Sequence, residues 1–159
     1  MELFEIQNNR FGKCIFSLET IPEGTVIHRF SGKPMLYDET KKLGDVESYA
    51  LQTGTEFYLF LDEPARYFNH SCDPSCGLTP ELELVALRDI SKGEELNYDY
   101  STTMLERDWH MKCHCNKEKC RQVITDFDRL PKKLQEHYLA LNVVQQYIVD
   151  ALNKKNDRG

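Results

Sequence analysis

Over the first hundred residues of this 159-residue chain, apolar and polar residues alternate in short stretches. Such alternation with a period of two is typical of β-strands that bury one face. Turn-forming groups rich in Asn, Gly and Pro separate the stretches. The pattern predicts strands at residues 2–7, 13–18, 26–30, 49–52, 56–61, 82–87 and 96–100. We expect a hairpin to join the strands on either side of residues 53–55, and the last two strands to form a further pair.

After Pro131 the pattern changes to helical spacing. The apolar positions are Leu134, Tyr138, Leu141, Val144, Tyr147, Ile148 and Leu152. They predict an amphipathic helix of roughly 20 residues, or a broken pair of helices, packed against the rest of the domain. Residues 33–48 are polar and charged, which indicates an inserted loop or short helix. The fold class expected is therefore mainly β with short helices and a C-terminal helical extension.

Composition fits one globular domain with a modest appendage: the mass is 18.6 kDa and 40% of the residues are hydrophobic. The first residues carry acids where a secretory signal would carry bases, and no apolar run approaches the roughly 18 residues of a membrane span. We therefore expect an intracellular protein, cytoplasmic or nuclear, without a membrane partner. Export into a host cell and the oligomeric state are not fixed by the sequence.

Charge is divided unevenly along the chain. Residues 1–103 contain 9 Lys and Arg against 18 Asp and Glu, whereas residues 104–159 contain 11 against 8. An acidic body repels nucleic-acid phosphate and attracts Lys- and Arg-rich peptides. The sequence thus disfavours direct nucleic-acid binding and makes a basic protein substrate plausible, although acidity also serves solubility alone.

Cysteines cluster near the C-terminal third of the chain. Cys113, Cys115 and Cys120 lie within eight residues, and a tetrahedral four-thiolate zinc site needs a fourth ligand from elsewhere. We expect Cys72 to supply it and zinc to have a structural role. Cys76 and His114 are rival ligands.

Two further segments carry candidate chemistry. Asn69-His70-Ser71-Cys72-Asp73-Pro74 is a polar run that ends in turn-forming residues, and such segments are usually sites or caps. Tyr98-Asp99-Tyr100 places two phenols on the same face of a predicted strand, which could equally be aromatic packing.

The order of these pieces resembles the SET-domain family of protein lysine methyltransferases across nearly all of residues 10–124. Phe11 to Phe16 is similar to the glycine motif of the family, and Ile21 to Thr25 to the turn that follows. Arg66 to Pro74 and Gly93 to Tyr100 are similar to its two signatures. Cys113 to Cys120 resembles its post-SET zinc tail.

The resemblance implies a SET-domain fold of small sheets around a knot-like crossing. It divides the chain into a SET domain at 1–103, a post-SET zinc-binding segment at 104–124 and a helical extension at 125–159. It also implies methyl transfer from S-adenosylmethionine to lysine in a histone or another basic protein. The chain looks like a small stand-alone member of the family.

Carried over by position, the resemblance assigns roles to individual residues. Tyr100 would be the central catalytic tyrosine, Tyr98 would set the number of methyl groups, and Tyr49 would be a further tyrosine of the lysine channel. A tyrosine at position 98 favours monomethylation. The residues implied to hold the cofactor are Gly12, Lys13, Cys14, Arg66, Tyr67, Asn69, His70 and Tyr100.

Two departures from the family pattern concern affinity. Cys14 stands where a second glycine is common, and Arg121-Gln122 replaces the glycine that often follows the last zinc cysteine.

Two other functions remain open from the sequence. One is a catalytically inactive, zinc-stabilised peptide-binding module with the same fold, and the other is an unrelated metal-storage or redox protein that uses its six thiols.

Overall fold

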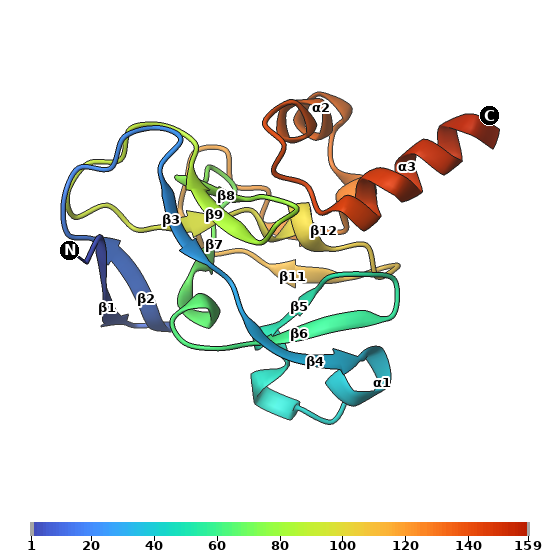
Figure 1. Ribbon diagram of the computed structural model, residues 1–159, viewed down its shortest axis with the longest axis horizontal. Coiled ribbons are helices and arrows are strands. Elements are labelled where there is room, and N and C mark those ends of the chain that lie inside the picture. The colour runs from blue at the N-terminus through green and yellow to red at the C-terminus, as the bar shows by residue number, and fades with distance from the viewer. Residues whose placement is uncertain (1, 159) are drawn as a thin grey trace.

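Small β-sheets make up most of the protein, as the computed structural model of residues 2–158 shows (Figure 1). One antiparallel pair joins β1 (Phe4–Asn9) to β2 (Gly12–Ser17), and another joins β11 (His110–Lys112) to β12 (Val123–Thr125). Two sheets have three strands each. The helices are the short α1 (Tyr37–Thr40), α2 (Lys132–Ala140) and α3 (Gln146–Arg158). The expected mainly β fold with a helical C-terminal extension is confirmed.

The two three-stranded sheets enclose the main core. One has the order β3 (Val26–Arg29), β9 (Glu83–Ala86), β8 (Cys76–Leu78), and the other has the order β4 (Gly32–Leu36), β6 (Phe57–Leu61), β5 (Ala50–Gln52). All their pairings are antiparallel. Their inward-facing side chains, with Phe68 and Leu96, form one apolar cluster. Burial of alternate residues explains the period of two in the sequence.

A two-stranded parallel pair crosses the centre of the molecule. β7 (Asn69–His70) pairs with β10 (Asn97–Tyr98), and the backbone N–H of Ser71 donates to the carbonyl of Tyr98 at 3.1 Å. This pairing brings the polar run after Phe68 beside the segment that carries the paired tyrosines. It is the feature of the fold that creates the site.

The C-terminal helices are a broken pair, which was one of the two expected arrangements. Helix α2 and helix α3 lie to one side of the sheets, and α3 extends away from the body (Figure 1). Their apolar side chains and Phe127 form a second core cluster. Gly77 in β8 permits this packing, because a β-carbon there would lie only 2.6 Å from the side chain of Val143. The helices therefore pack on the sheet, as expected.

Several details differ from the strand prediction. The strands predicted at 82–87 and 96–100 do not pair with each other: β9 lies between β3 and β8, whereas β10 pairs with β7. Tyr100 lies beyond β10 in a 3-10 helix, Tyr100–Thr103. Tyr49 ends another 3-10 helix, Gly44–Tyr49, just before β5. Within residues 2–158, no helix is both long and apolar enough to cross a membrane.

Candidate active site and cysteine cluster

Tyr98 and Tyr100 form the floor of a central cavity. Their ring centroids lie 4.9 Å apart. The Tyr100 hydroxyl donates a hydrogen bond of 2.8 Å to the carbonyl of Phe68, at the entrance to β7. Burial raises the pKa of both phenols well above the ordinary value. Both groups therefore stay protonated at neutral pH, so neither phenol can serve as a base there.

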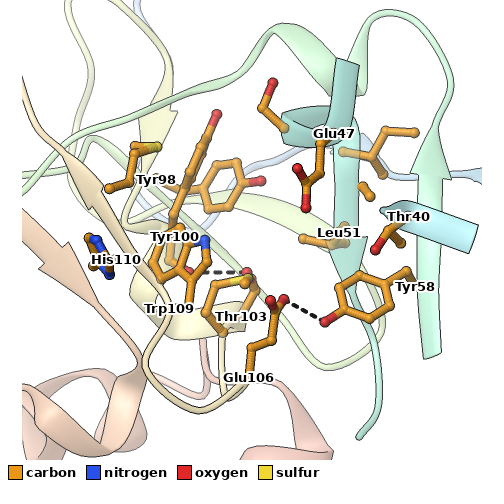
Figure 2. A pocket seen from close by; sticks show the side chains of 15 residues that line it. Thr40, Glu47, Leu51, Tyr58, Tyr98, Tyr100, Thr103, Glu106, Trp109 and His110 are labelled. Carbon is orange, nitrogen blue, oxygen red and sulfur yellow. Dashed lines mark hydrogen bonds between the residues drawn. The ribbon is translucent and has the colours of Figure 1, made fainter. Parts of the chain in front are cut away.

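The cavity has a volume of about 360 Å³ and is lined by residues between Thr40 and Met111. Figure 2 shows Glu47, from the 3-10 helix before β5, and Glu106, from the segment after Thr103, pointing toward the same space. The Tyr58 hydroxyl donates to the Glu106 carboxylate at 2.6 Å. Burial raises the pKa of Glu106, although that hydrogen bond opposes the shift. No Lys or Arg is among the residues that line the cavity.

The ring of Tyr49 packs edge-to-face against the rings of Phe60 and Tyr67. It does not line the cavity, but it packs on the same core cluster as Tyr100. The guanidinium of Arg66 lies 5.1 Å from the Tyr49 ring centroid, and its Nε donates to the carbonyl of Leu61 at 3.0 Å. The side chain of Arg66 is thus already committed to protein contacts. Its predicted cofactor role stays a prediction.

The glycine motif lies next to β7. Gly12 has a φ of +123°, and a β-carbon there would meet no atom within 4 Å, so the backbone borders open space. The Asn69 side chain donates to the carbonyl of Lys13 at 3.1 Å. The Lys13 ammonium lies 4.8 Å from the Tyr67 ring centroid, and the Tyr67 hydroxyl donates to Glu63 at 2.6 Å.

Two other residues of the glycine motif, Cys14 and Phe11, differ in their exposure. Cys14 is fully buried, and its thiol donates to the carbonyl of Gln7 at 3.4 Å. Phe11 is 63% exposed and stacks on His114 with ring centroids 5.7 Å apart. This stack joins the glycine motif to the cysteine-rich segment. Open backbone, a side-chain amide and an exposed aromatic ring suit a nucleoside-containing ligand, so the residues present fit S-adenosylmethionine.

Four thiols converge on one point. The sulfurs of Cys72, Cys113, Cys115 and Cys120 all lie within 4.8 Å of one another. Four sulfurs held about 2.3 Å from a zinc ion at tetrahedral angles would be about 3.8 Å apart, and the Cys72 and Cys113 sulfurs are separated by 3.7 Å. The residues therefore fit the ion. Neither rival ligand belongs to this group.

Hydrogen-bond donors surround the cysteine sulfurs, as is needed to stabilise thiolates. Backbone N–H groups of Cys115, Arg121 and Gln122 each point at a cysteine sulfur at 3.4 Å. Burial raises the pKa of Cys72 to about 11, and a bound divalent cation favours the thiolate instead. His70 accepts from the Tyr100 N–H at Nδ1, 3.0 Å, which leaves Nε2 to donate to the Cys72 sulfur at 3.3 Å. The His70 ring thus links the cluster to Tyr100.

Comparison with known proteins identifies the fold. The SET domain family matches residues 12–101. The chain belongs to the SET-domain family. The crystal structure of the methyltransferase domain of human histone-lysine N-methyltransferase SETMAR superposes with a TM-score of 0.62 at 22% identity, over 77% of this chain and 58% of that one. The expected SET-domain fold is confirmed.

Curated relatives carry related names. The H3 lysine-36 specific histone-lysine N-methyltransferase of Mycosarcoma maydis is 25% identical over 134 residues, covering 72% of this chain and 14% of the relative. Histone-lysine N-methyltransferase ash1 of Drosophila melanogaster is 31% identical over 121 residues, covering 65% and 5%. The probable histone-lysine N-methyltransferase set-23 of Caenorhabditis elegans is 39% identical over 67 residues, covering 37% and 28%. This SET-domain chain spans less than a third of the length of each.

The SET-domain match ends at Ser101, before the cysteine trio and the C-terminal helices. Sequence reasoning missed several site residues in this later part and around it: Tyr58, Asp99, Glu106 and Tyr138. Trp109 and Glu106 line the cavity, whereas Asp99 and Tyr138 hydrogen-bond to each other behind it. The periodic pattern placed Tyr58 in a strand and Tyr138 in a helix, but it could not show what their hydroxyls contact, and Glu106 lies in a segment without such a pattern. Only the position of Asp99 between two predicted site tyrosines was a signal.

Proposed function

We propose that this SET-domain protein is a lysine N-methyltransferase that uses S-adenosylmethionine. Its substrate is a histone or another basic protein, and it mainly adds a single methyl group to the target lysine. The observation that carries the proposal is the pair of buried, protonated tyrosines at the floor of a cavity whose charged lining is acidic. The family membership and the histone-lysine methyltransferases among the relatives support the same activity. We place the protein inside the cell, where such substrates occur.

A target lysine must lose its proton before its nitrogen can attack. From a reference pKa near 10.4, deprotonation at pH 7 costs about 4 to 5 kcal/mol. When bound, S-adenosylmethionine supplies an activated methyl group and a positive charge. The aromatic walls of the cavity exclude water and disfavour an ammonium ion next to that charge. The Tyr98 and Tyr100 rings hold the amine in one orientation, which is the main requirement of a single displacement.

The cofactor would lie on the other side of the crossing, beside Gly12, Lys13, Tyr67 and Asn69. The Asn69 amide and the Lys13 carbonyl already meet there. We assign the backbone of Cys14 and of His70 to the same site, because both side chains are engaged in protein contacts. Arg66 is assigned to the same cofactor site, whereas Tyr49, whose ring its guanidinium contacts, is assigned to the lysine channel.

Zinc is proposed as a structural ion bound by the four clustered thiols. When bound, it would fasten the post-SET segment, proposed at 104–124, to Cys72 in the SET domain, proposed at 1–103. Four thiol ligands would fill a tetrahedral site and leave no position open for catalysis. The remaining residues, 125–159, are assigned to the helical extension.

The basic-substrate part of the proposal follows from charge. Glu47 and Glu106 both face the cavity, and Tyr58 holds the Glu106 carboxylate in place. A cationic side chain entering this space would find carboxylates without a competing Lys or Arg in the lining.

The test is transfer of a labelled methyl group to a histone mixture and to basic peptides. Removing the Tyr100 hydroxyl in Tyr100→Phe should lower the rate at least about hundredfold, as loss of one oriented dipole does at other active sites. Tyr37→Phe, which removes a hydroxyl outside the cavity lining, is the matched control and should keep the rate. Binding of the demethylated cofactor product is measured in parallel by calorimetry. A wild-type protein that binds this product but transfers no methyl group would be an inactive peptide-binding module.

A further inference from the structure

Asp99 is a buried carboxylate at the junction of three parts of the chain. Its side chain is fully inaccessible to solvent, and it lies between the two site tyrosines in sequence. It accepts hydrogen bonds from both terminal nitrogens of Arg121, at 2.8 and 2.9 Å, and from the Tyr138 hydroxyl at 2.9 Å. The backbone N–H of Ser101 donates to it at 3.0 Å.

Charge explains why these partners are needed together. An unpaired carboxylate in a protein interior is very costly, and a paired one is tolerated only when its lone pairs are satisfied. The planar guanidinium of Arg121 matches the carboxylate with two parallel hydrogen bonds, a geometry that lysine cannot reproduce. The Tyr138 hydroxyl fills a further acceptor position on Asp99. The set closes around one carboxylate, so losing any partner loosens the others.

Arg121 connects the cysteine cluster to the hydrogen-bonded group around Asp99. It follows Cys120 directly, and its own backbone N–H points at the Cys72 sulfur at 3.4 Å. The side chain and the backbone of one residue therefore contact the site segment and the thiol cluster at the same time. The same guanidinium also donates to the Ser101 hydroxyl at 3.2 Å, which in turn donates to the carbonyl of Thr125 in β12.

Tyr138 connects the C-terminal extension to the hydrogen-bonded group around Asp99. It is the buried residue of α2, and its ring belongs to the core cluster that α2 and α3 form with Phe127. Its hydroxyl passes out of that cluster to reach Asp99. Helix α2 thereby touches the segment that holds Tyr98 and Tyr100.

We propose that Arg121, Asp99 and Tyr138 form a positioning network that fixes the orientation of Tyr98 and Tyr100 relative to the cysteine cluster, and that the C-terminal helices are thereby part of the catalytic apparatus. The three residues act through the tyrosines and do not contact the cavity. For its effect on catalysis the inference rests on the proposed methyltransferase function.

The decisive variant is Tyr138→Phe, which removes one oxygen and keeps the ring. Tyr147→Phe is the matched control, because its hydroxyl is also buried in the C-terminal helices but donates to the carbonyl of Thr103 at 2.5 Å instead of to Asp99. Arg121→Lys keeps the charge and loses the two-pronged contact. For each protein we would measure kcat, the KM of a basic peptide, the ratio of mono- to dimethylated product and zinc per chain.

We expect Tyr138→Phe and Arg121→Lys to lower kcat by about three- to thirtyfold, since small misplacements of orienting groups have effects of this order. The product ratio should change as well, while peptide KM stays within about twofold and zinc stays at one per chain. Tyr147→Phe should leave the product ratio unchanged. Equal rate losses in Tyr138→Phe and Tyr147→Phe with an unchanged product ratio would overturn the proposal, because general loosening alone would then explain them.

A measurement that does not require catalytic activity tests this inference independently of the proposed function. Amide hydrogen exchange at Ser101, whose N–H donates to Asp99, should accelerate at least about tenfold in Tyr138→Phe and not in Tyr147→Phe. If the wild-type protein methylates nothing, the proposed function fails, and the exchange result still decides whether the network orders the site segment. Unchanged exchange at Ser101 in both Tyr138→Phe and Arg121→Lys overturns the network itself.

Discussion

The phenol rings of Tyr98 and Tyr100 lie with centroids 4.9 Å apart and planes inclined by 45°. The two hydroxyls differ in their surroundings. Tyr100 donates to the Phe68 carbonyl, whereas the Tyr98 hydroxyl has no hydrogen-bond partner among residues 2–158. It therefore occupies space at the floor of the cavity without being tied to the protein, and it is the group most able to limit the room beside a methylated amine.

Replacing Tyr98 by phenylalanine should change the product, because removal of this hydroxyl frees space for a second methyl group. We expect the share of di- and trimethyl lysine to rise severalfold while the first methylation keeps its rate within about fivefold, since no proton transfer depends on this phenol. Mass spectrometry of a peptide product measures the change. Tyr37→Phe serves as the control. An unaltered product mixture in Tyr98→Phe would show that the hydroxyl does not limit methylation.

Cys72→Ser should abolish stoichiometric zinc. It removes the one ligand that comes from the SET domain, and three remaining thiols from a single short segment cannot close the tetrahedron. Native mass spectrometry should show a fall from one zinc per chain to none, together with rapid amide exchange in residues 113–120. The control is Cys76→Ala: this thiol is equally buried but contacts Ser75 rather than the cluster. Loss of zinc from Cys76→Ala with retention in Cys72→Ser would reverse our ligand assignment.

Glu106→Gln should weaken binding of basic peptides. The change removes a negative charge from the cavity but keeps an acceptor for the Tyr58 hydroxyl. We expect peptide KM to rise about three- to tenfold, with cofactor affinity unchanged, and the difference from wild type to shrink at high salt. Burial raises the Glu106 pKa, so the wild-type KM should also increase on acidification earlier than an ordinary glutamate would allow.

The matched control for that charge change is Glu83→Gln. Glu83 pairs with Arg29 on the surface at 3.1 Å and lies outside the cavity lining. Its substitution should leave peptide KM within about twofold, as expected for a partly exposed pair. Equal effects of the two substitutions would mean that overall charge, rather than the cavity, attracts the substrate.

Two glycine substitutions should destabilise the protein to different degrees. A β-carbon at Gly77 would press on the Val143 side chain, and the loop between the helices can shift to make room. We expect a loss of about 1 to 3 kcal/mol in the free energy of unfolding. At Gly32 the new atom would overlap the backbone carbonyl of Phe60 in the paired strand, so the loss should be larger. Denaturant titration would measure both, and a Gly77→Ala protein as stable as wild type would contradict this packing.

Local signals in the sequence were strong enough to predict the parts of the site that lie in short motifs. The spacing of Cys113, Cys115 and Cys120 implied a missing ligand, and the geometry now brings Cys72 to them. The two tyrosines two residues apart were expected on one face of a strand, and they do meet. They do so across the end of β10 and the start of a 3-10 helix, because the strand is only two residues long.

The rest depends on contacts between distant residues, which no local pattern reports. The strand pairing β7–β10 joins two-residue strands 28 residues apart, too short for a period to be read. Asp99 meets Arg121 and Tyr138 at sequence separations of 22 and 39 residues. Nothing in the sequence around Glu106 distinguishes it from the other acidic residues of the chain. Only the fold shows that it faces a cavity.

The separation of Cys72 from Cys113 by 41 residues also bears on how the molecule is made. Ribosomes deliver the chain from its first residue onward at about 5 to 20 residues per second. The lone thiol leaves the exit tunnel seconds before its three partners, and the Arg121 and Tyr138 contacts become available later still. Metal capture therefore cannot be completed before Cys120 has emerged, and closure of the tyrosine segment has to wait for Tyr138. Nascent chains stalled before Cys120 has emerged should retain no zinc, whereas released full-length chains should.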